Sequence, residues 1–230
     1  MVPQTLPILP LSNCVLLPSI ITTLNVCSSE GQKLLRMASA SYFVCVPFKK
    51  DNIKQISSSC VDLSELFHYG CVAQVISCDK SLPDQYSIKV KGVCRSRIRD
   101  ISNSDGGSIY EALLEHYFGN DCIQAEETVF FNSLCQMYIT KLRLIGVSCH
   151  VLDQFNQLMA KSQKSQIANL LLYLTDSSLG DKLRILEAVD VKQRLHQVHN
   201  AVSSYLQVYT YIYIYIRHAY ITLTRNSIYA

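Results

Sequence analysis

Two stretches of the chain decide its fold: Leu6-Pro-Ile-Leu-Pro-Leu-Ser-Asn-Cys-Val-Leu-Leu-Pro18 and Tyr86-Ser-Ile-Lys-Val-Lys-Gly-Val-Cys-Arg-Ser-Arg-Ile-Arg-Asp-Ile101. In both, apolar and β-branched residues alternate or form short runs, a pattern typical of strands, and proline or glycine interrupts them. All six prolines lie at or before Pro83, so the early part of the chain tolerates strand edges and turns. The later part is free to be helical, and we expect a β-rich part followed by a helical part.

The same patterns predict the individual elements of the early part. Strands are expected over residues 6–11, 20–26, 43–47, 71–78, 86–91, 95–101 and 108–118. One helix is expected among them, capped by Ser28 or Ser29, with a buried stripe of Leu34, Leu35, Met37 and Ala38. Leu82-Pro83-Asp84 is expected to form a hairpin turn, and Gly92-Val93 to bend the chain between two strands.

From about Asp121 the apolar spacing changes to the helical period. Helices are expected over residues 122–144, 148–160, 164–174 and 181–188, and from 191 onward. The last of these places Val191, Leu195, Val198, Val202 and Leu206 on one face. Asp190 with Gln193 three residues later is a start that resembles a capping box.

Composition limits the class of protein. With 230 residues, 49% hydrophobic and 17% charged, the chain can bury one large core or two small ones. Its net charge is +3, but residues 1–190 carry 17 basic and 18 acidic side chains, a sum of −1, so the body lacks an overall basic footprint for nucleic acid. Ten cysteines without a Cys-x-x-Cys pair are interpreted as reduced, buried side chains in an intracellular compartment, and neither a disulfide framework nor a metal site is expected.

Four motifs, in order and in register, carry a resemblance to a known family: Leu-Pro-Ile-Leu-Pro-Leu from Leu6, Asp62-Leu-Ser-Glu-Leu-Phe-His-Tyr-Gly70, Lys91-Gly-Val-Cys-Arg95, and Asp181-Lys-Leu-Arg-Ile-Leu-Glu-Ala-Val-Asp-Val-Lys-Gln-Arg-Leu195. The second motif leads into a strand, and the third is interpreted as a turn. Up to about Val208, the chain resembles the amino-terminal substrate-recognition domain of Lon-type ATP-dependent proteases. The Gly-Val-Cys-Arg version of the turn is most similar to the peroxisomal branch of that family.

The resemblance implies an α+β fold, with a PUA-like β-barrel lobe over residues 1–118 and an α-helical bundle over 119–208. It also implies a function in protein quality control, in which the domain captures unfolded or damaged protein clients from the rim of a hexameric ATPase. We expect a chain truncated before the ATPase part, with no cofactor and no membrane span. The resemblance suggests the peroxisomal matrix, although no terminal targeting signal is recognised, and the cytoplasm is the alternative.

The other candidate sites have plainer interpretations. Gly31-Gln-Lys33 and Gly180-Asp-Lys182 lack the first glycine and the hydroxyl residue of a phosphate loop, and no protease motif is recognised, so the chain is not expected to be an enzyme. A basic stripe could bind RNA, but it is more simply interpreted as a solvated strand face; its members are Lys89, Lys91, Arg95, Arg97 and Arg99. His196 and His199, three residues apart on a helix, could contact one metal ion, but no carboxylate or cysteine is near them in the sequence, and no metal site is expected. Ser57-Ser-Ser59 and the serines of 102–108 are interpreted as loops.

No catalytic, cofactor or metal residue is therefore assigned, and the residues that contact clients are left unassigned. A stand-alone adaptor of the same fold and an RNA-binding module remain the alternative functions. No nucleic-acid partner is expected.

Residues 209–230 form an atypical low-complexity tail, which begins Tyr209-Thr-Tyr-Ile-Tyr-Ile-Tyr-Ile216. The segment from Leu195 to Ile216 contains no Lys, Arg, Asp or Glu, and alternating tyrosine and isoleucine favour association with other apolar segments. Because a TATATA repeat encodes this alternation, read-through of non-coding DNA is a hypothesis for its origin.

Overall fold

The computed structural model describes residues 2–27, 34, 42–50, 62–82, 85–103, 110–118, 125–175 and 177–205. Its strands are β1 (Thr5–Leu11), β2 (Ile21–Cys27), β3 (Tyr42–Pro47), β4 (Tyr69–Leu82), β5 (Gln85–Ser102) and β6 (Glu111–Tyr117). Its helices are α2 (Ala125–Leu144), α3 (Cys149–Lys161), α4 (Lys164–Tyr173) and α5 (Leu179–Glu187), followed by helical residues 191–205. The expected α+β class is confirmed.

The chain forms two compact units. The β unit consists of residues 1–122 and 178–194, and the helical unit of residues 123–177 and 195–230. The first break lies near the expected boundary at residue 118. The prediction placed residues 181–188 with the helices, whereas α5 groups with the strands.

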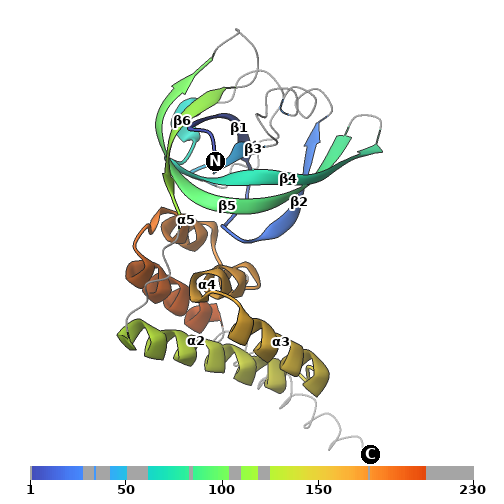
Figure 1. The fold of residues 1–230 in the computed structure, drawn as a ribbon, viewed down its shortest axis with the longest axis vertical. Helices are drawn as coiled ribbons and strands as arrows, with labels where there is room; N and C mark the ends of the chain where they lie inside the picture. The colour runs from blue at the N-terminus through green and yellow to red at the C-terminus, as the bar shows by residue number, and fades with distance from the viewer. Residues whose placement is uncertain are drawn as a thin grey trace, which may run out of the picture. The chain divides into compact units, whose positions relative to one another are not determined.

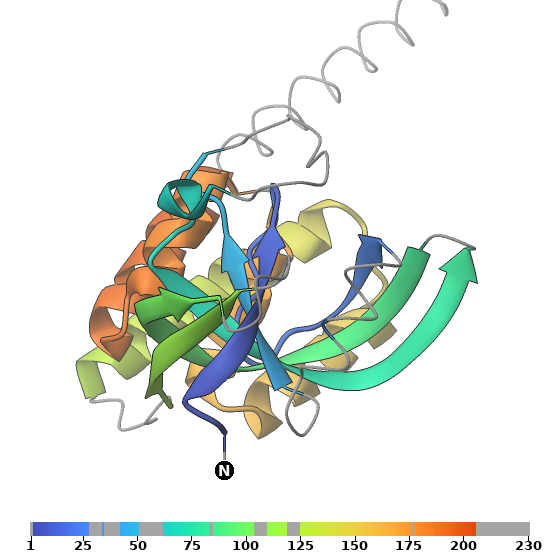
Figure 2. The same ribbon diagram turned by 90° about the horizontal axis from the view of Figure 1, so that it is seen from above.

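The six strands of the β unit form one sheet that closes on itself. The strand order is β2-β5-β4-β3-β1-β6, and β5 also pairs with β6 (Figures 1 and 2). The pairing of β1 with β3 is parallel, and the other pairings are antiparallel. Closure covers most strand edges, and β2 extends the sheet beside the first half of β5.

β1 contains two prolines, Pro7 and Pro10. Each proline nitrogen faces a side of β1 on which, at that residue, no neighbouring strand is paired. The Ile8 N–H donates to the Tyr110 carbonyl (2.8 Å), so the nitrogen of Pro10, two residues on, faces the same side. Pairing with β6 ends at Pro7, before that point, and pairing with β3 begins only at Ile8. The Leu-Pro-Ile-Leu-Pro-Leu motif therefore forms a strand without losing ladder hydrogen bonds.

β5 is a single long strand, although the sequence predicted two strands with a turn between them. Along β4, Ala73 pairs with Gly92 and Val72 pairs with Cys94, so Val93 is an extra residue and the ladder shifts register. This is a β-bulge, and the prediction of a turn at Lys91–Arg95 is wrong. The expected bend at Gly92-Val93 corresponds to this irregularity.

Gly92 lies against the segment that connects β1 to β2. The Ser19 N–H donates to the Gly92 carbonyl (2.8 Å), and the Gly92 N–H donates to the Ile20 carbonyl (2.9 Å). A Cβ at this position would overlap the Leu17 carbonyl oxygen and lie 2.9 Å from the Leu17 carbonyl carbon. Only glycine permits this close approach of two backbone segments.

The interior of the closed sheet is apolar. Its buried core consists of Leu6, Ile8, Val44, Val46, Phe48, Leu66, Val72, Cys94, Ala112 and Leu114. α5 belongs to the same unit: Leu183, Ile185 and Leu186 are buried, and Glu187 Oε1 lies 3.0 Å from Nε2 of His68, just before β4. The Ser178 hydroxyl accepts from the Asp181 N–H and caps this helix.

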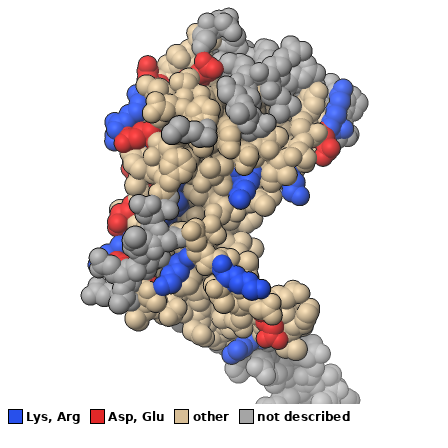
Figure 3. Space-filling model, viewed as in Figure 1, with Lys and Arg blue, Asp and Glu red and all other residues tan. Residues whose placement is uncertain are grey.

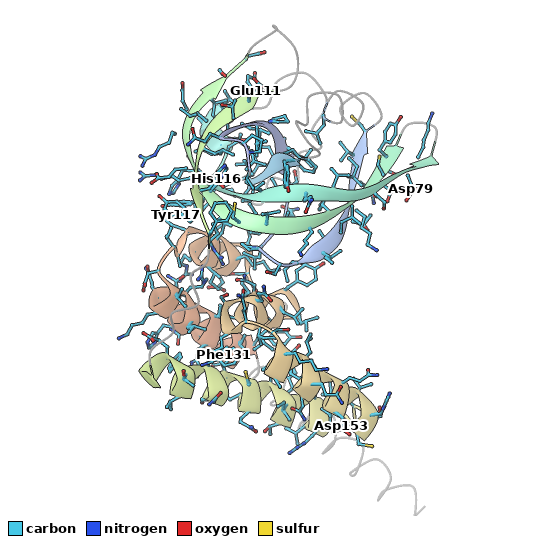
Figure 4. All side chains as sticks on the ribbon, in the orientation of Figure 1. Asp79, Glu111, His116, Tyr117, Phe131 and Asp153 are labelled. Carbon is cyan, nitrogen blue, oxygen red and sulfur yellow. The ribbon has the colours of Figure 1, made fainter. Side chains whose placement is uncertain are left out.

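The helical unit has its own core. It contains Phe131, Leu134, Cys135, Tyr138 and Ile139 of α2, Leu152 of α3, Ile167, Ala168, Leu171 and Leu172 of α4, and Leu195, Val198 and Val202. Figure 4 shows Phe131 on α2. The predicted face of the last helix is confirmed at Leu195, Val198 and Val202, and the Gln193 N–H donates to Asp190 Oδ2 (2.9 Å) as the capping pattern predicted.

Most element boundaries lie within a few residues of the predicted ones. The expected hairpin is supported by the pairing of Leu82 with Gln85, although Pro83 and Asp84 themselves lie outside the described residues. The helix expected after Ser28 also lies outside them, except for Leu34, which is buried. Within the described ranges, no helix combines the length and apolar composition needed to cross a membrane.

α2 ends in a Schellman motif that turns the chain toward α3. The Val147 N–H donates to the Leu142 carbonyl, and the Gly146 N–H donates to the Arg143 carbonyl. Gly146 has φ +80°, in the left-handed region that favours glycine.

Gly146→Ala is expected to lower the free energy of unfolding by about 1 kcal/mol, because alanine is strained at positive φ. No atom lies within 4 Å of the added Cβ, so the effect isolates backbone strain. The matched control is Gly180→Ala in the first turn of α5, where the nearest atom would be 3.8 Å away and alanine should not lower stability. Urea unfolding measures both, and an equal effect of the two changes would contradict this account.

Candidate functional site

α3 has an arc of apolar side chains that the rest of the helical unit covers only in part. Leu158, Val151, Phe155, Met159 and Leu152 follow one another around the helix within an arc of about 120°, at 100° per residue. Leu152, at one edge of the arc, is 9% exposed, and Phe155 in the middle is half-buried and stacks with Tyr138 of α2 at a ring distance of 5.7 Å. Val151 and Leu158, at the other edge, are 46% and 44% exposed. We call Val151, Phe155 and Leu158 the α3 face.

α3 itself contains few charged residues, although Lys141 and Arg143 lie in the last turn of α2. Asp153 and Lys161 are the only Asp, Glu, Lys or Arg residues in the sequence of α3, and Asp153 lies about 200° around the helix from Val151 (Figure 4). Leu144 and Ile145, at the end of α2, are also about half exposed. Figure 3 shows that most of the described surface visible in that view is neither acidic nor basic. Such a surface suits weak binding of exposed apolar side chains.

The β unit also exposes large apolar side chains, but they come from separate strands. These are Ile21 of β2, Ile76 of β4, Leu113 of β6 and Phe118 after β6. Ile21 pairs across the ladder with the exposed Lys91. In contrast to the α3 face, these side chains do not follow one helix or strand.

The basic stripe considered for RNA is not continuous. Arg95 is 4% exposed, so the expectation of a solvated strand face is wrong at this position. Burial, and then the nearby charge of Arg194, lower the pKa of Arg95 to about 9. Arg99 forms an ion pair with Glu115, whereas Lys89, Lys91 and Arg97 are exposed.

His196 and His199 both lie against Phe130 of α2. The ring centroids are 4.3 Å and 4.4 Å from that of Phe130, so both imidazoles contact the same aromatic ring. The described part of the chain holds no group of three or more His, Cys, Asp or Glu side chains placed to share a metal ion. The observed role of the two histidines is packing of the last helix on α2.

The structure brings together one pair of polar side chains, Ser96 and His116, that the sequence does not predict. Ser96 Oγ lies 2.8 Å from Nδ1 of His116, and Nε2 of His116 lies 2.7 Å from the carbonyl oxygen of Pro3 (Figure 4 labels His116). Because a carbonyl only accepts, Nε2 carries the hydrogen and Nδ1 accepts from Ser96. A serine and a histidine at this distance are reminiscent of a nucleophile with its base, but Ser96 is fully buried, so the pair ties residue 3 to β6.

Four of the described cysteines are buried as predicted, whereas the prediction is wrong for Cys14, Cys27 and Cys149, which are exposed, and Cys78 is partly exposed. Cys45, Cys71, Cys94 and Cys135 lie inside the two units, and burial raises the pKa of each thiol, to about 11 for Cys94 and about 12 for Cys135. Raised pKa values keep these thiols protonated and unreactive at neutral pH.

The remaining predicted positions do not form a site. Gly180-Asp-Lys182 lies in the first turns of α5, where the backbone is helical. Gly31-Gln-Lys33 and Ser57-Ser-Ser59 lie outside the described residues.

Comparison with known sequences gives one family and several relatives. Residues 5–204 match the family described as ATP-dependent protease La (LON) substrate-binding domain. The chain is 23% identical over 208 residues to a Lon protease from Desulfosudis oleivorans, covering 90% of this chain and 24% of that protein. It is 21% identical over 204 residues to the peroxisomal Lon protease homolog 2 of Danio rerio, covering 84% of this chain and 24% of that protein. The chain thus spans about a quarter of the length of these relatives.

Comparison with solved structures supports the fold. The N-terminal domain of the Mycobacterium avium complex Lon protease matches with a TM-score of 0.67 at 14% identity, covering 86% of this chain and 98% of that one. At this identity the likeness concerns the arrangement of strands and helices.

Proposed function

Because the chain belongs to the family of ATP-dependent protease La (LON) substrate-binding domains, we propose that it binds unfolded or damaged proteins as clients for a Lon-type protease. The observation that supports this proposal is the α3 face, where Val151 and Leu158 expose aliphatic surface beside Phe155. Binding of this kind needs a complementary apolar surface and no reacting group. We therefore assign the chain no nucleotide hydrolysis, no peptide cleavage, no cofactor and no metal.

The α3 face alone gives weak binding. Burying one aliphatic side chain contributes about 1.5–3 kcal/mol, and Val151 and Leu158 are already about half covered. Two such side chains contribute roughly 2–3 kcal/mol, less than the 4 kcal/mol of a millimolar complex. Several copies held close together, as in a hexamer, would raise the affinity through effective concentration. We include assembly with Lon-type subunits in the proposal for this reason.

The peroxisomal matrix is the compartment that we propose, since the Danio rerio relative carries that location in its name and the Gly-Val-Cys-Arg motif resembles the same branch. The cytoplasm is the alternative.

A stand-alone adaptor would use the same α3 face and differ only in the machinery that it serves. The RNA-binding alternative loses support from the burial of Arg95 and the ion pair of Arg99.

Val151→Asp combined with Leu158→Lys is expected to lower client affinity at least about fivefold, because charged groups lose hydration when an apolar segment covers them. The pair leaves the net charge unchanged and places each charge at the favourable end of the helix dipole. The probe is permanently unfolded, carboxymethylated α-lactalbumin, passed over the full chain immobilised at high density on a biosensor. High density supplies the multivalency that a single copy lacks.

The matched control is Asn156→Asp combined with Ala160→Lys, which adds the same charges on the opposite side of α3. Both positions are exposed, and the control should bind like the unmodified chain. Equal loss in both double variants would show that charge, not the α3 face, decides binding. Failure of the unmodified chain to bind the probe at any density would reject the proposed function.

A further inference from the structure

We propose that β2 binds an extended, acidic segment of a client, which adds to the sheet as a further antiparallel strand. This inference rests on the proposed function only for the identity of the partner, an unfolded protein. The contact itself follows from the pairing of β2, from the composition of this strand and from the charge beside it. Main-chain hydrogen bonds supply most of such a contact, so clients of unrelated sequence can share it.

β2 lies at one end of the strand order, beside β5 (Figure 1). All seven of its residues pair with β5, from Ile21 with Lys91 to Cys27 with Gln85, without a register shift. Among the described residues, no strand lies along the opposite edge, which we call the β2 edge. An edge of this kind is a template for the addition of another strand.

The main-chain groups that face the β2 edge follow from the pairing. The Gly92 N–H donates to the Ile20 carbonyl (2.9 Å), so this carbonyl points toward β5. Because the direction alternates along a strand, the groups of residues 22, 24 and 26 also point toward β5. The residues that face the β2 edge are therefore Ile21, Thr23 and Asn25. Their side chains are exposed, and each offers one N–H donor and one carbonyl acceptor.

β4 has an unpaired edge as well, but that edge is protected. Pairing of β4 with β3 ends at Gln74, so no described strand lies on that side of the second half of β4. That half contains Asp79, Lys80 and two register shifts, and charges and bulges hinder the addition of a strand. β2 has the sequence Ile-Thr-Thr-Leu-Asn-Val-Cys, without a charge, a proline or a bulge. The β2 edge thus lacks the features that keep an edge unpaired.

Two lysines lie beside the β2 edge on the outer face of the sheet. Lys91 pairs across the ladder with Ile21, and Lys89 pairs with Thr23, so the lysines share a face with these exposed side chains. Their partners on β4 are the uncharged residues Gln74 and Ser77. No ion pair joins either lysine to an acidic side chain of the described ranges. The face beside the β2 edge is therefore positively charged.

An acidic segment complements this charge, whereas a second copy of β2 does not. A strand added at the β2 edge lies about 10 Å from β5, and a glutamate and a lysine can together span that distance across the short side chain of Thr23. Pairing of β2 with β2 of another copy would instead place the lysines of both copies on one face, where they repel. Charge complementarity thus identifies the partner as an acidic strand.

Hydrogen exchange of the full chain, followed by NMR, tests the contact residue by residue. In the free chain, the three amides of the β2 edge should exchange at least about tenfold faster than those of residues 22, 24 and 26, which donate to β5. The probe is a peptide as long as β2 that alternates glutamate with valine. An excess of it should slow exchange at Ile21, Thr23 and Asn25 about fivefold or more.

Two results of this measurement would overturn the inference. Slow exchange at the β2 edge before the peptide is added would show that the edge is already paired, within the chain or with a second copy. Unchanged exchange in excess peptide would show that no strand is added.

N-methylated peptides test the main-chain hydrogen bonds. In an antiparallel pair the glutamates share a face with Thr23, and their N–H groups point toward β2. N-methyl groups on the glutamates should therefore weaken binding about tenfold or more, whereas N-methyl groups on the valines point away from β2 and should weaken it less than about threefold. Fluorescence anisotropy of the labelled peptides with the full chain measures both, and an equal loss would contradict strand addition.

Thr23→Pro removes one donor of the β2 edge and keeps the pairing with β5, because proline is tolerated where the nitrogen of an edge strand faces outward. It should lower the affinity for the peptide about tenfold or more. Thr23→Val keeps the N–H and is the matched control, with unchanged affinity. Urea unfolding checks that both variants fold. Unchanged affinity in a folded Thr23→Pro variant would contradict the proposal, and the N-methylated peptides decide the question if this variant does not fold.

Lys89→Gln combined with Lys91→Gln tests the charge of the partner. The double variant should bind the acidic peptide about threefold to tenfold more weakly at low ionic strength, and a peptide with glutamine in place of glutamate equally well. Lys50→Gln combined with Arg97→Gln is the matched control, since it removes two exposed charges at positions that do not pair with β2. Equal loss in the two double variants would reject the role of the lysines and with it the acidic partner.

These measurements separate the inference from the proposed function. Peptide binding at the β2 edge, with no binding of carboxymethylated α-lactalbumin by the full chain, would reject client capture and leave the edge contact standing. Binding of α-lactalbumin that depends on Val151 and Leu158, with no protection of the β2 amides by the peptide, would reject the edge contact and leave the proposed function standing.

Discussion

Gly92→Ala is expected to destabilise the β unit by about 3 kcal/mol or more. The added Cβ would overlap the Leu17 carbonyl oxygen, which belongs to backbone and cannot rotate away. Separating the two segments would lengthen the hydrogen bonds of Gly92 with Ser19 and Ile20. It would also expose Leu16 and Leu17, which are 2% and 1% exposed.

Thiol labelling with mass spectrometry measures this effect separately in each unit. Cys71 Sγ would lie 3.1 Å from the added Cβ, and Cys71 and Cys94 are buried in the β unit, whereas Cys135 is buried in the helical unit. In Gly92→Ala, labelling in dilute urea should accelerate about 100-fold or more at Cys71 and less at Cys135. Gly180→Ala is the control and should not accelerate labelling. A Cys71 rate within threefold of the unmodified chain would contradict the close-approach argument.

Leu134→Ala is expected to cost the helical unit about 2–5 kcal/mol. Leu134 is fully buried in α2, and its truncation leaves a cavity that close-packed helices fill only in part. Val129→Ala is the matched control on the same helix, because Val129 is 70% exposed and should change stability by no more than about 0.5 kcal/mol.

The same labelling experiment gives the reverse pattern for Leu134→Ala. Burial holds the Cys135 pKa near 12, so this thiol reacts only when the helices open. Labelling of Cys135 should accelerate strongly in Leu134→Ala and hardly at all in Val129→Ala, with a smaller change at Cys71. If labelling accelerated more at Cys71 than at Cys135, the β unit and the helical unit would not unfold separately, in contradiction to this prediction.

The sequence predicts most elements because their patterns are local. Alternation identifies β1 to β4, and the helical period identifies α2 to α5 within a few residues. The sequence predicts a turn where β5 has a bulge, because a glycine inside a strand pattern gives the same local signal in both cases. Only the Leu17 carbonyl, brought close by the fold, explains why Gly92 is needed.

Long-range contacts account for the other differences. The sequence identifies α5 as a helix, but its packing on β4 depends on residues more than a hundred positions earlier. Arg95 has a charged side chain in an alternating pattern, which is typical of a solvated face. Its burial is accompanied by that of Arg194, from the start of the last helix.

The α3 face could not be predicted from the sequence, because its exposure also depends on long-range contacts. The helix over 148–160 was predicted, and its apolar residues are visible in the sequence. Whether an apolar arc is buried depends on how the neighbouring helices pack on it. Leu152 is buried and Phe155 stacks with Tyr138 of α2, whereas Val151 and Leu158 remain about half exposed. Both α3 and α4 contain several apolar residues, but six residues of α4 are buried, whereas in α3 only Leu152 is buried. This difference is visible only in the packed structure.

The division of the β unit into residues 1–122 and 178–194 has a consequence for synthesis on the ribosome. All six strands have been translated by residue 122, but the helix that packs on β4 follows only after the helical insertion. At 5–20 residues per second, the 72 residues from 122 to 194 take about 4–14 s to translate. During that interval the nascent sheet lacks α5, so the part of β4 that α5 contacts in the finished chain is still open to solvent.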